Sequence, residues 1–599
     1  MKLSSTWLVC AAALGLTTLL STVMVTAAPG ADAPGEVSRD AVLRAMADEV
    51  AREKALQLNN LDKPYEITYA SDDPDEITMS ASLGGLLFSR RDHTRRVVIR
   101  VRVGDAKFDN SDSVYTRAPG NAVLPLDDNY HVIRDQLWLN TDRVYKTALV
   151  DIERKRTALR EISDPDKTPD FAAANPIQIV QPLPTLRMDQ KHWEQIIESL
   201  SGQFAAHPEI VFSNVRLRAI SSTFRLVDTD GTIERVPEEL AEVAITARAL
   251  APDGTQVWDD RFFTTLHPSE LPGEQDLKKA VDETATETAA LAKAPIAEEY
   301  SGPVLFEREA AAQLMAEVLA DASRVERRPL VPPEYANRLR ILDSVWSTRQ
   351  GTKVAPEWLT IFDNPAQKRA EGVVLAGQYD VDEEGVAAKS VTLVQNGTLK
   401  DFLSTRQPTH DGQVSNGHAR LPGEFGAELA AFGNVFVQAT GGISDAQLKA
   451  KLLENVKSSN LKYGILIRRL DFPATAGADE LRNMLSQLQK EGVTRTVTAP
   501  LLAYRVYPDG HEELVRGLRF KEFSAKDLRD LEAASDHPYV FNYINNGSAF
   551  NYANSGAGAT TSSVICPSLL FYTVDLDRAR EETGKPPEVP APSLVAASE

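Results

Sequence analysis

Apolar and polar positions follow recognisable periods along most of this chain. In the first half, apolar residues recur at helical spacing near 38–56, 133–162, 189–204 and 274–293, which predicts four helices. Between the last two helices, strand patterns cover 210–220, 223–227 and 242–250, with a turn signal at Asp230-Gly231. Helices and antiparallel strands therefore alternate without the regular strand–helix–strand rhythm of a parallel sheet, and we expect an α+β unit.

The second half is dominated by strand patterns. Asn396-Gly397 lies inside an alternating run and is the strongest hairpin signal in the chain. Ser444 is a suitable N-cap for a helix that extends to Val456. Strands are predicted at 370–380, 390–403, 435–440, 463–469, 493–507, 513–520 and 562–574.

The segment Tyr300–Leu319 connects the two halves. Gly302-Pro303 interrupts what precedes it, Val304–Phe306 has the composition of a short buried strand, and the residues that follow favour a helix. This pattern predicts a strand that leads directly into a junction helix over 307–320. We therefore place an N-terminal α+β domain at 38–299 and a C-terminal, mainly antiparallel β domain at 300–580.

The two ends of the chain have different compositions. Lys2 precedes an uncharged apolar run, Trp7–Val25, and the small residues at 25–28 follow the pattern of a cleavage site. We expect a signal peptide at 1–27, and hence export to the periplasm or the cell exterior; a retained membrane anchor is the alternative. A linker is predicted at 28–37 and a disordered tail at 581–599, while no other stretch is apolar enough to span a bilayer.

Composition and charge exclude some function classes. Of the 599 residues, 43% are hydrophobic and 25% are charged, which is typical of a globular protein. The formal net charge is −20 and the acids are dispersed, so nucleic-acid binding is not expected, because phosphate contacts need a basic face. The chain has two cysteines; once Cys10 leaves with the signal peptide, Cys566 remains alone among apolar neighbours, and we interpret it as a structural thiol.

Two further segments carry residues suited to chemistry. Residues 307–313 read Glu-Arg-Glu-Ala-Ala-Ala-Gln at the start of the junction helix. Residues 414–420 read Val-Ser-Asn-Gly-His-Ala-Arg after a predicted strand. These segments, with 562–571, resemble the TldD/PmbA family of metallopeptidases, whose active members carry His-Glu-x-x-x-His at the strand-to-helix junction.

The resemblance implies a changed site, because Arg308 and Gln313 stand at the two histidine positions and only Glu309 is retained. A metallopeptidase needs neutral imidazoles to hold zinc while the glutamate takes a proton from water. Arg308 has no lone pair to donate, and Gln313 is a weak ligand. The third ligand of active members is a cysteine in a late loop, where this chain has the Asn- and Gly-rich segment 541–559. We therefore expect no metal ligands, no cofactor and a vestigial Glu309.

The 415–420 loop is a candidate part of a binding cleft, together with Arg308 and Gln313. Asn416-Gly417 predicts a tight turn that would direct His418 and Arg420, beside Ser415, toward a cavity. In one interpretation these side chains clamp a peptide or its carboxylate. In the other they satisfy loop carbonyls and a nearby acid, and so fix the shape of the loop.

The family resemblance also implies an architecture and partners. The resemblance implies a two-domain fold, with a helix-and-sheet N-terminal domain and a C-terminal domain of curved antiparallel sheets. It further implies a homodimer, or a heterodimer with an active TldD-like subunit, around a chamber for peptides or unfolded proteins. The metal-free TldE (PmbA) type is the nearer match, so our first hypothesis is a non-catalytic subunit that supports peptide processing.

Two alternatives remain open from the sequence. One is an active metallopeptidase with a rebuilt zinc site that uses His410, His418, Glu307 or Glu309. The other is a stand-alone peptide-binding module in the periplasm or on the cell surface.

Overall fold

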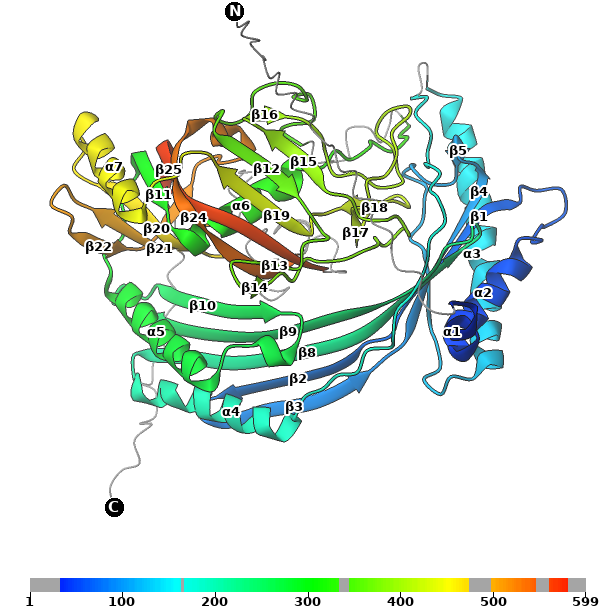
Figure 1. The fold of residues 1–599 in the computed structure, drawn as a ribbon, viewed down its shortest axis with the longest axis horizontal. Helices are drawn as coiled ribbons and strands as arrows, with labels where there is room; N and C mark the ends of the chain where they lie inside the picture. Colours follow the sequence, from blue (N-terminus) through cyan, green and yellow to red (C-terminus); the bar gives the residue numbers. More distant parts are fainter. Residues whose placement is uncertain (1–32, 163–165, 333–343, 473–496, 546–559, 580–599) are drawn as a thin grey trace, which may run out of the picture.

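A computed structural model describes residues 33–162, 166–332, 344–472, 497–545 and 560–579. Two large sheets dominate it (Figure 1), and the helices pack around and between them. The strands of the first sheet all precede residue 266, and those of the second begin at Tyr300. The predicted signal peptide, the loop at 546–559 and the tail at 581–599 lie outside the described residues.

The first sheet has ten strands in the order β10-β9-β8-β1-β4-β5, with β2 and β3 added beside β8. The short strands β6 and β7 pair with β4 and β9. The strands are β1 (Pro64–Asp72), β2 (Asp75–Ser82), β3 (Gly85–His93), β4 (Arg96–Asp105), β5 (Phe108–Asp109), β6 (Gly120–Val123), β7 (Gln178–Val180), β8 (Ile210–Asp228), β9 (Ile233–Leu250) and β10 (Gln256–Thr265).

The long hairpin of β8 and β9 is the backbone of this sheet. Its strands pair from Ile210 opposite Ala249 to Val227 opposite Ile233. The carboxylate of Asp228 accepts hydrogen bonds from the backbone N–H groups of Gly231 and Thr232, which closes the turn that the Asp-Gly pair predicts. Because β8 is so long, it pairs with β2 along its first part and with β1 along its second.

Helices cover the first sheet at both of its ends. In Figure 1, α4 and α5 lie on the outer side of the curved sheet, and α1 to α3 pack at the opposite end. Each group buries its own apolar cluster against the strands. The helices are α1 (Ala33–Arg39), α2 (Ala41–Glu53), α3 (Tyr130–Leu159), α4 (Gln190–Gly202) and α5 (Glu274–Lys293).

The second sheet has eleven strands in the order β16-β15-β12-β19-β25-β11-β20-β21-β22, with β23 and β24 also paired to β25. Most pairs are antiparallel, while β11 with β20 and β19 with β25 are parallel. Its strands are β11 (Tyr300–Phe306), β12 (Leu359–Asp363), β15 (Val391–Gln395), β16 (Thr398–Leu399), β19 (Asn434–Ala439), β20 (Gly464–Leu470), β21 (Pro500–Val506), β22 (Glu512–Val515), β23 (Leu518–Phe520), β24 (Leu531–Asn545) and β25 (Thr560–Arg578). Beside it lie the pairs β13 (Arg369–Ala370) with β14 (Val373–Val374), and β17 (Ala419–Pro422) with β18 (Glu428–Ala430).

Helix α6 (Arg308–Ala322) follows β11 directly and is the centre of the second half. It is buried on nearly every side, whereas the sequence predicts a single apolar face. Two polar side chains of α6 are buried because each has a partner. Gln313 accepts a hydrogen bond from the backbone of Leu470 at 2.8 Å, and Glu317 accepts two from Thr498. Helix α7 (Asp445–Ser458) begins after Ser444, which forms the predicted cap.

The α+β fold class is confirmed, and three local predictions are corrected. Residues 370–380 alternate like a strand but contribute only to β13 and β14, because none of the described strands pairs with the rest of the segment. The described part of the predicted linker, from Ala33 onward, is helical. The helix predicted from about residue 38 begins at Ala41, because Asp40 caps it: its carboxylate accepts from the N–H groups of Val42 and Leu43.

Candidate functional site

The residues at the family's motif positions lie where β11 ends and α6 begins. Arg308 has a φ of 39°, in the left-handed region, and its amide donates a hydrogen bond to Ser568 Oγ on β25 at 3.1 Å. Its side chain is exposed, and its guanidinium lies 5.2 Å from the ring centre of Tyr539. Arg308 is therefore held at the surface against an aromatic ring.

Glu309 and Gln313 face each other one helical turn apart. The Gln313 amide nitrogen donates to Glu309 Oε1 at 3.2 Å, while its amide oxygen is the acceptor for Leu470. Both ends of the Gln313 side chain are therefore engaged. Glu309 is about a quarter exposed, and its Oε1 lies 3.6 Å from Nε of Arg469.

Arg469, on β20, forms the centre of a charged group that includes Glu309. One of its terminal nitrogens lies 2.6 Å from Oδ1 of Asp259 on β10 and 3.4 Å from Oε2 of Glu287 on α5. Burial raises the pKa of Asp259, and the nearby Arg469 guanidinium opposes that rise. Burial also raises the pKa of Glu287, but the neighbouring Arg469 and Arg261 guanidinium groups lower it by more, so this pKa lies below its ordinary value. The cation is thus shared by acids from three elements.

Sequence reasoning missed this group. Arg468 and Arg469 are two adjacent charged residues inside the apolar strand Gly464–Leu470, and that interruption is the signal that could have indicated it. Arg468 points elsewhere: its guanidinium bonds Glu307 at 3.0 Å and Glu512 at 2.9 Å. Glu307 is therefore also engaged in an ion pair.

The 415–420 loop lies elsewhere, and most of its polar groups face the protein. His418 is fully buried; its Nε2 lies 2.7 Å from Oδ2 of Asp363, and its Nδ1 lies 2.9 Å from the side-chain oxygen of Asn416. Asn416 also bonds to the backbone of Phe402 and Ser404. Ser415 donates to the Ser404 carbonyl at 3.3 Å. These contacts fix the path of the loop.

Arg420, at the end of the loop, is half-buried. Its guanidinium stacks on the Tyr379 ring at 4.0 Å and bonds the hydroxyl of Thr560, at the start of β25. Arg308 contacts β25 at Ser568, eight residues further along, or about 26 Å on an extended strand. The two groups of predicted site residues therefore do not converge on one site.

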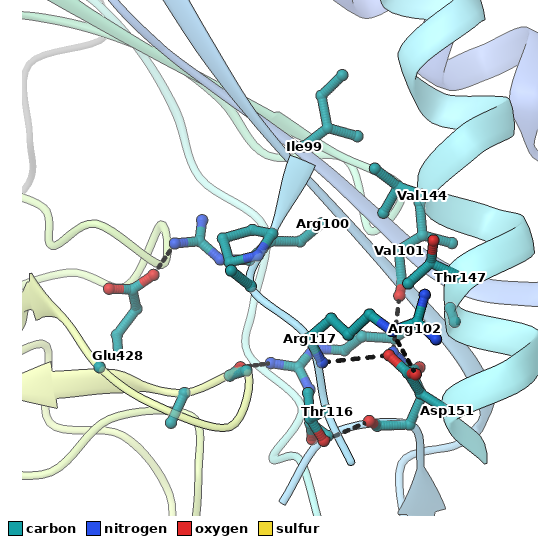
Figure 2. A pocket seen from close by; sticks show the side chains of 18 of the residues that line it. Ile99, Arg100, Val101, Arg102, Thr116, Arg117, Val144, Thr147, Asp151 and Glu428 are labelled. Atoms are coloured by element: carbon teal, nitrogen blue, oxygen red, sulfur yellow. Dashed lines mark hydrogen bonds and ion pairs between the residues drawn. The ribbon is translucent and has the colours of Figure 1, made fainter. Parts of the chain in front are cut away.

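The structure also contains a cavity of about 100 Å³ that includes none of these residues (Figure 2). It lies between β4, α3 and the 422–428 turn. Asp151 lines it, and the Arg117 backbone donates to that carboxylate at 3.2 Å. Arg100 points across the cavity to an ion pair with Glu428. These charged groups are thus paired with one another, while Arg102, which also lines the cavity, is paired with Asp109 and Glu66 outside it.

Among the described residues, no three His, Cys, Asp or Glu side chains come together in a way that could hold a metal ion. Cys566 is fully buried in β25, and burial raises the pKa of its thiol well above the ordinary value. None of the helices in the described ranges combines the length and apolar character needed to cross a bilayer.

We expect His418→Ala to lower the free energy of unfolding by about 3 kcal/mol, because it leaves the buried Asp363 carboxylate without its ring partner. His410→Ala is the matched control, since His410 is exposed on the same segment, and it should change stability by less than about 0.5 kcal/mol. Urea unfolding followed by circular dichroism measures both. Equal stability of the two variants would contradict a structural role and favour the clamp.

Comparison with known proteins agrees with the motif positions. Residues 299–471 match the family model for the PmbA/TldA metallopeptidase C-terminal domain. A metalloprotease of Methanothermobacter thermautotrophicus is 24% identical over 213 residues, which are 35% of this chain and 43% of that protein. A metalloprotease of Methanocaldococcus jannaschii is 35% identical over 65 residues, 11% of this chain and 13% of that protein. The chain thus matches less than half the length of these curated relatives.

A solved structure shares the whole architecture. TldE from Thermococcus kodakarensis superposes with a TM-score of 0.56 at 12% sequence identity, over 89% of this chain and 100% of that one. At this identity the likeness concerns the fold. The C-terminal domain match, the two metalloprotease relatives and the shared fold make this chain similar to proteins of the TldD/PmbA family.

Proposed function

We propose that this chain is an exported, TldE-like member of the family that does not hydrolyse peptides itself and supports peptide processing as a structural or peptide-positioning subunit. It would act as a homodimer, or as a heterodimer with an active TldD-like subunit, on peptides or unfolded proteins. The observation that carries the proposal is the guanidinium of Arg469 at 3.6 Å from Glu309. A fixed cation beside the family's catalytic acid leaves that acid committed to an ion pair.

The donor atoms at the motif positions do not suit zinc. Arg308 offers no lone pair, and both ends of Gln313 are used in hydrogen bonds. Zinc sites need His, Cys or carboxylate ligands converging at about 2 Å, and a catalytic site keeps three of them. Glu309 alone would supply one ligand, so we derive no metal-dependent step.

The geometry argues against a rebuilt site at the 415–420 loop. Both ring nitrogens of His418 face oxygen atoms of Asp363 and Asn416, so neither is available to a metal. Glu307 is paired with Arg468. His410 is exposed, and its ring lies against the backbone of Asp411. We therefore propose a single function.

Glu309→Gln tests whether the retained acid acts as a general base. We expect the wild-type protein, supplied with zinc, to cleave a mixed peptide library no faster than buffer, and the variant to behave identically, because Arg308 and Gln313 cannot hold a metal that would activate water for Glu309. Mass spectrometry of the library measures cleavage. Hydrolysis by the wild type that disappears in Glu309→Gln would contradict the proposal and support an active enzyme.

Export is supported by the apolar run Trp7–Val25 and the small residues that follow it. We expect the protein recovered from a bacterial envelope or medium fraction to begin near Ala28, as N-terminal sequencing would show. Replacing Leu14 and Leu16 by Arg should retain the full-length chain in the cytoplasm, because a charged h-region is not exported. Recovery of an uncleaved chain from the cytoplasm, with and without those changes, would contradict export.

A further inference from the structure

A buried acid, Glu234, lies at the boundary between the two halves of the molecule. We call this boundary, where the first sheet meets residues from 300 onward, the seam. Glu234 belongs to β9 of the first sheet, where it pairs with Leu226 on β8. Its side chain is 0% exposed, and neither carboxylate oxygen has a hydrogen-bond partner in the described structure. A buried carboxylate without donors is strongly disfavoured in its ionised form.

The turn at 381–387, from the second half, packs against this part of the first sheet. Asp382 shapes the turn by accepting hydrogen bonds from the backbone of Glu384 and Val386. Gly385 follows with a φ of 73°, and a Cβ there would lie 2.9 Å from Thr232 Cγ2 on the turn before β9. The turn therefore sits directly on the first sheet, with no room for a side chain.

Acids outnumber cations around Glu234. Glu238 faces it from β9, Asp382 and Glu383 face it from the turn, and Arg420 of β17 is the nearby cation. Further out, the charge of Asp72 on β1 raises the pKa of both Glu238 and Glu383. The charge of Arg100 on β4 lowers the pKa of Glu383. Burial is the main cause that raises the pKa of Glu234 well above its ordinary value and that of Glu238 to about 8, and the neighbouring acids add to it.

We propose that the protonation state of Glu234 controls the contact between the two halves: the 381–387 turn stays packed on the first sheet while the carboxyl is neutral, and it is released when the carboxyl ionises. The turn is connected to the candidate binding loop, because the Asp382 carboxylate accepts from the Ala419 backbone N–H at 3.0 Å and the Glu383 backbone N–H donates to the Ala419 carbonyl at 2.8 Å. Release of the turn would therefore change the position of Arg420. This inference goes beyond the proposed function and does not depend on it.

The direction of the pH effect follows from the two pKa values. The carboxyl has a raised pKa when the seam is closed and an ordinary one, about 4.3, when it is open to water. The contribution of this contact is fully present below the open-state pKa, and it is lost as the pH rises toward the raised value. Each carboxyl that ionises on opening increases the opening constant about tenfold per pH unit across that window.

Hydrogen–deuterium exchange of the full chain between pH 6 and 8, corrected for the intrinsic exchange rates, tests the proposal. In the wild type, we expect protection of peptides that cover 226–238 and 380–390 to fall as the pH rises. The side chain of Glu234→Gln cannot ionise. Its protection should therefore fall less steeply than that of the wild type, by about a factor of ten per pH unit. Glu239→Gln is the control on the same strand, a residue partly exposed beside His267, and it should match the wild type.

Identical pH dependence in the wild type and Glu234→Gln would overturn the proposal, as would loss of protection in Glu234→Gln at pH 6. If Glu234→Gln does not fold, Glu383→Gln provides the test from the opposite side of the seam. Removing that acid should lower the raised pKa of Glu234, so the loss of protection should be smaller and should end at a lower pH, and an unchanged profile would overturn the proposal equally. Infrared spectroscopy at pH 7 adds a direct readout, because a protonated Glu234 gives a carboxylic-acid band that Glu234→Gln lacks.

Discussion

One guanidinium, that of Arg469, connects the two sheets of this protein. It belongs to β20 of the second sheet, yet its shortest contact is with Asp259 on β10 of the first, a carboxylate with no exposed surface. Removing either partner would leave the other charge buried and unpaired, which costs more than the pair itself contributes. The relative position of the two sheets is therefore constrained at this point. Because Glu309 and Glu287 approach the same guanidinium, α6 and α5 are fixed by it as well.

Polar contacts of this kind occur at several places along the boundary between the two halves, and the balance of acids and cations differs among them. Near Arg469, the acids share a guanidinium, and Trp258 adds a hydrogen bond from its indole nitrogen to Asp471 at 3.0 Å. Near Glu234, acids are in excess and two carboxylate oxygens have no donor in the described structure. A nearby cation opposes the rise in pKa that burial causes, and a buried acid without such a partner lacks this opposition. The acids at the motif position thus have a cation within ion-pair distance, whereas Glu234, near the 415–420 loop, has no hydrogen-bond donor in the described structure.

Local signals in the sequence located many elements correctly. The Asn396-Gly397 turn joins β15 to β16, Ser444 caps α7, and the strand-to-helix junction falls at β11 and α6, because each depends on neighbouring residues. Strand 531–545 was missed, since its alternation is broken by a bulge around His537 and Pro538. Its partner β25 defines it, and pairing between strands is not encoded locally.

The candidate site shows the same limit. The chemistry of Arg308 and Gln313 follows from their side chains alone, so their poor fit to zinc was predictable from the sequence. Asp259 and Arg469 are 210 residues apart, and only the fold reveals that they meet. The sequence analysis also predicts that the 415–420 loop and the start of α6 line one cleft. In the structure they contact β25 at two separate positions, Thr560 and Ser568.

The central claim is that the motif side chains are committed to one another and to Arg469, so that no metal is held at this position. Elemental mass spectrometry of the mature protein, purified without chelators or a metal-affinity tag, tests this most directly. The account predicts less than about a tenth of an equivalent of zinc, iron or manganese per chain, because a functional metal site is close to fully occupied. Close to one equivalent of any of these metals would contradict it.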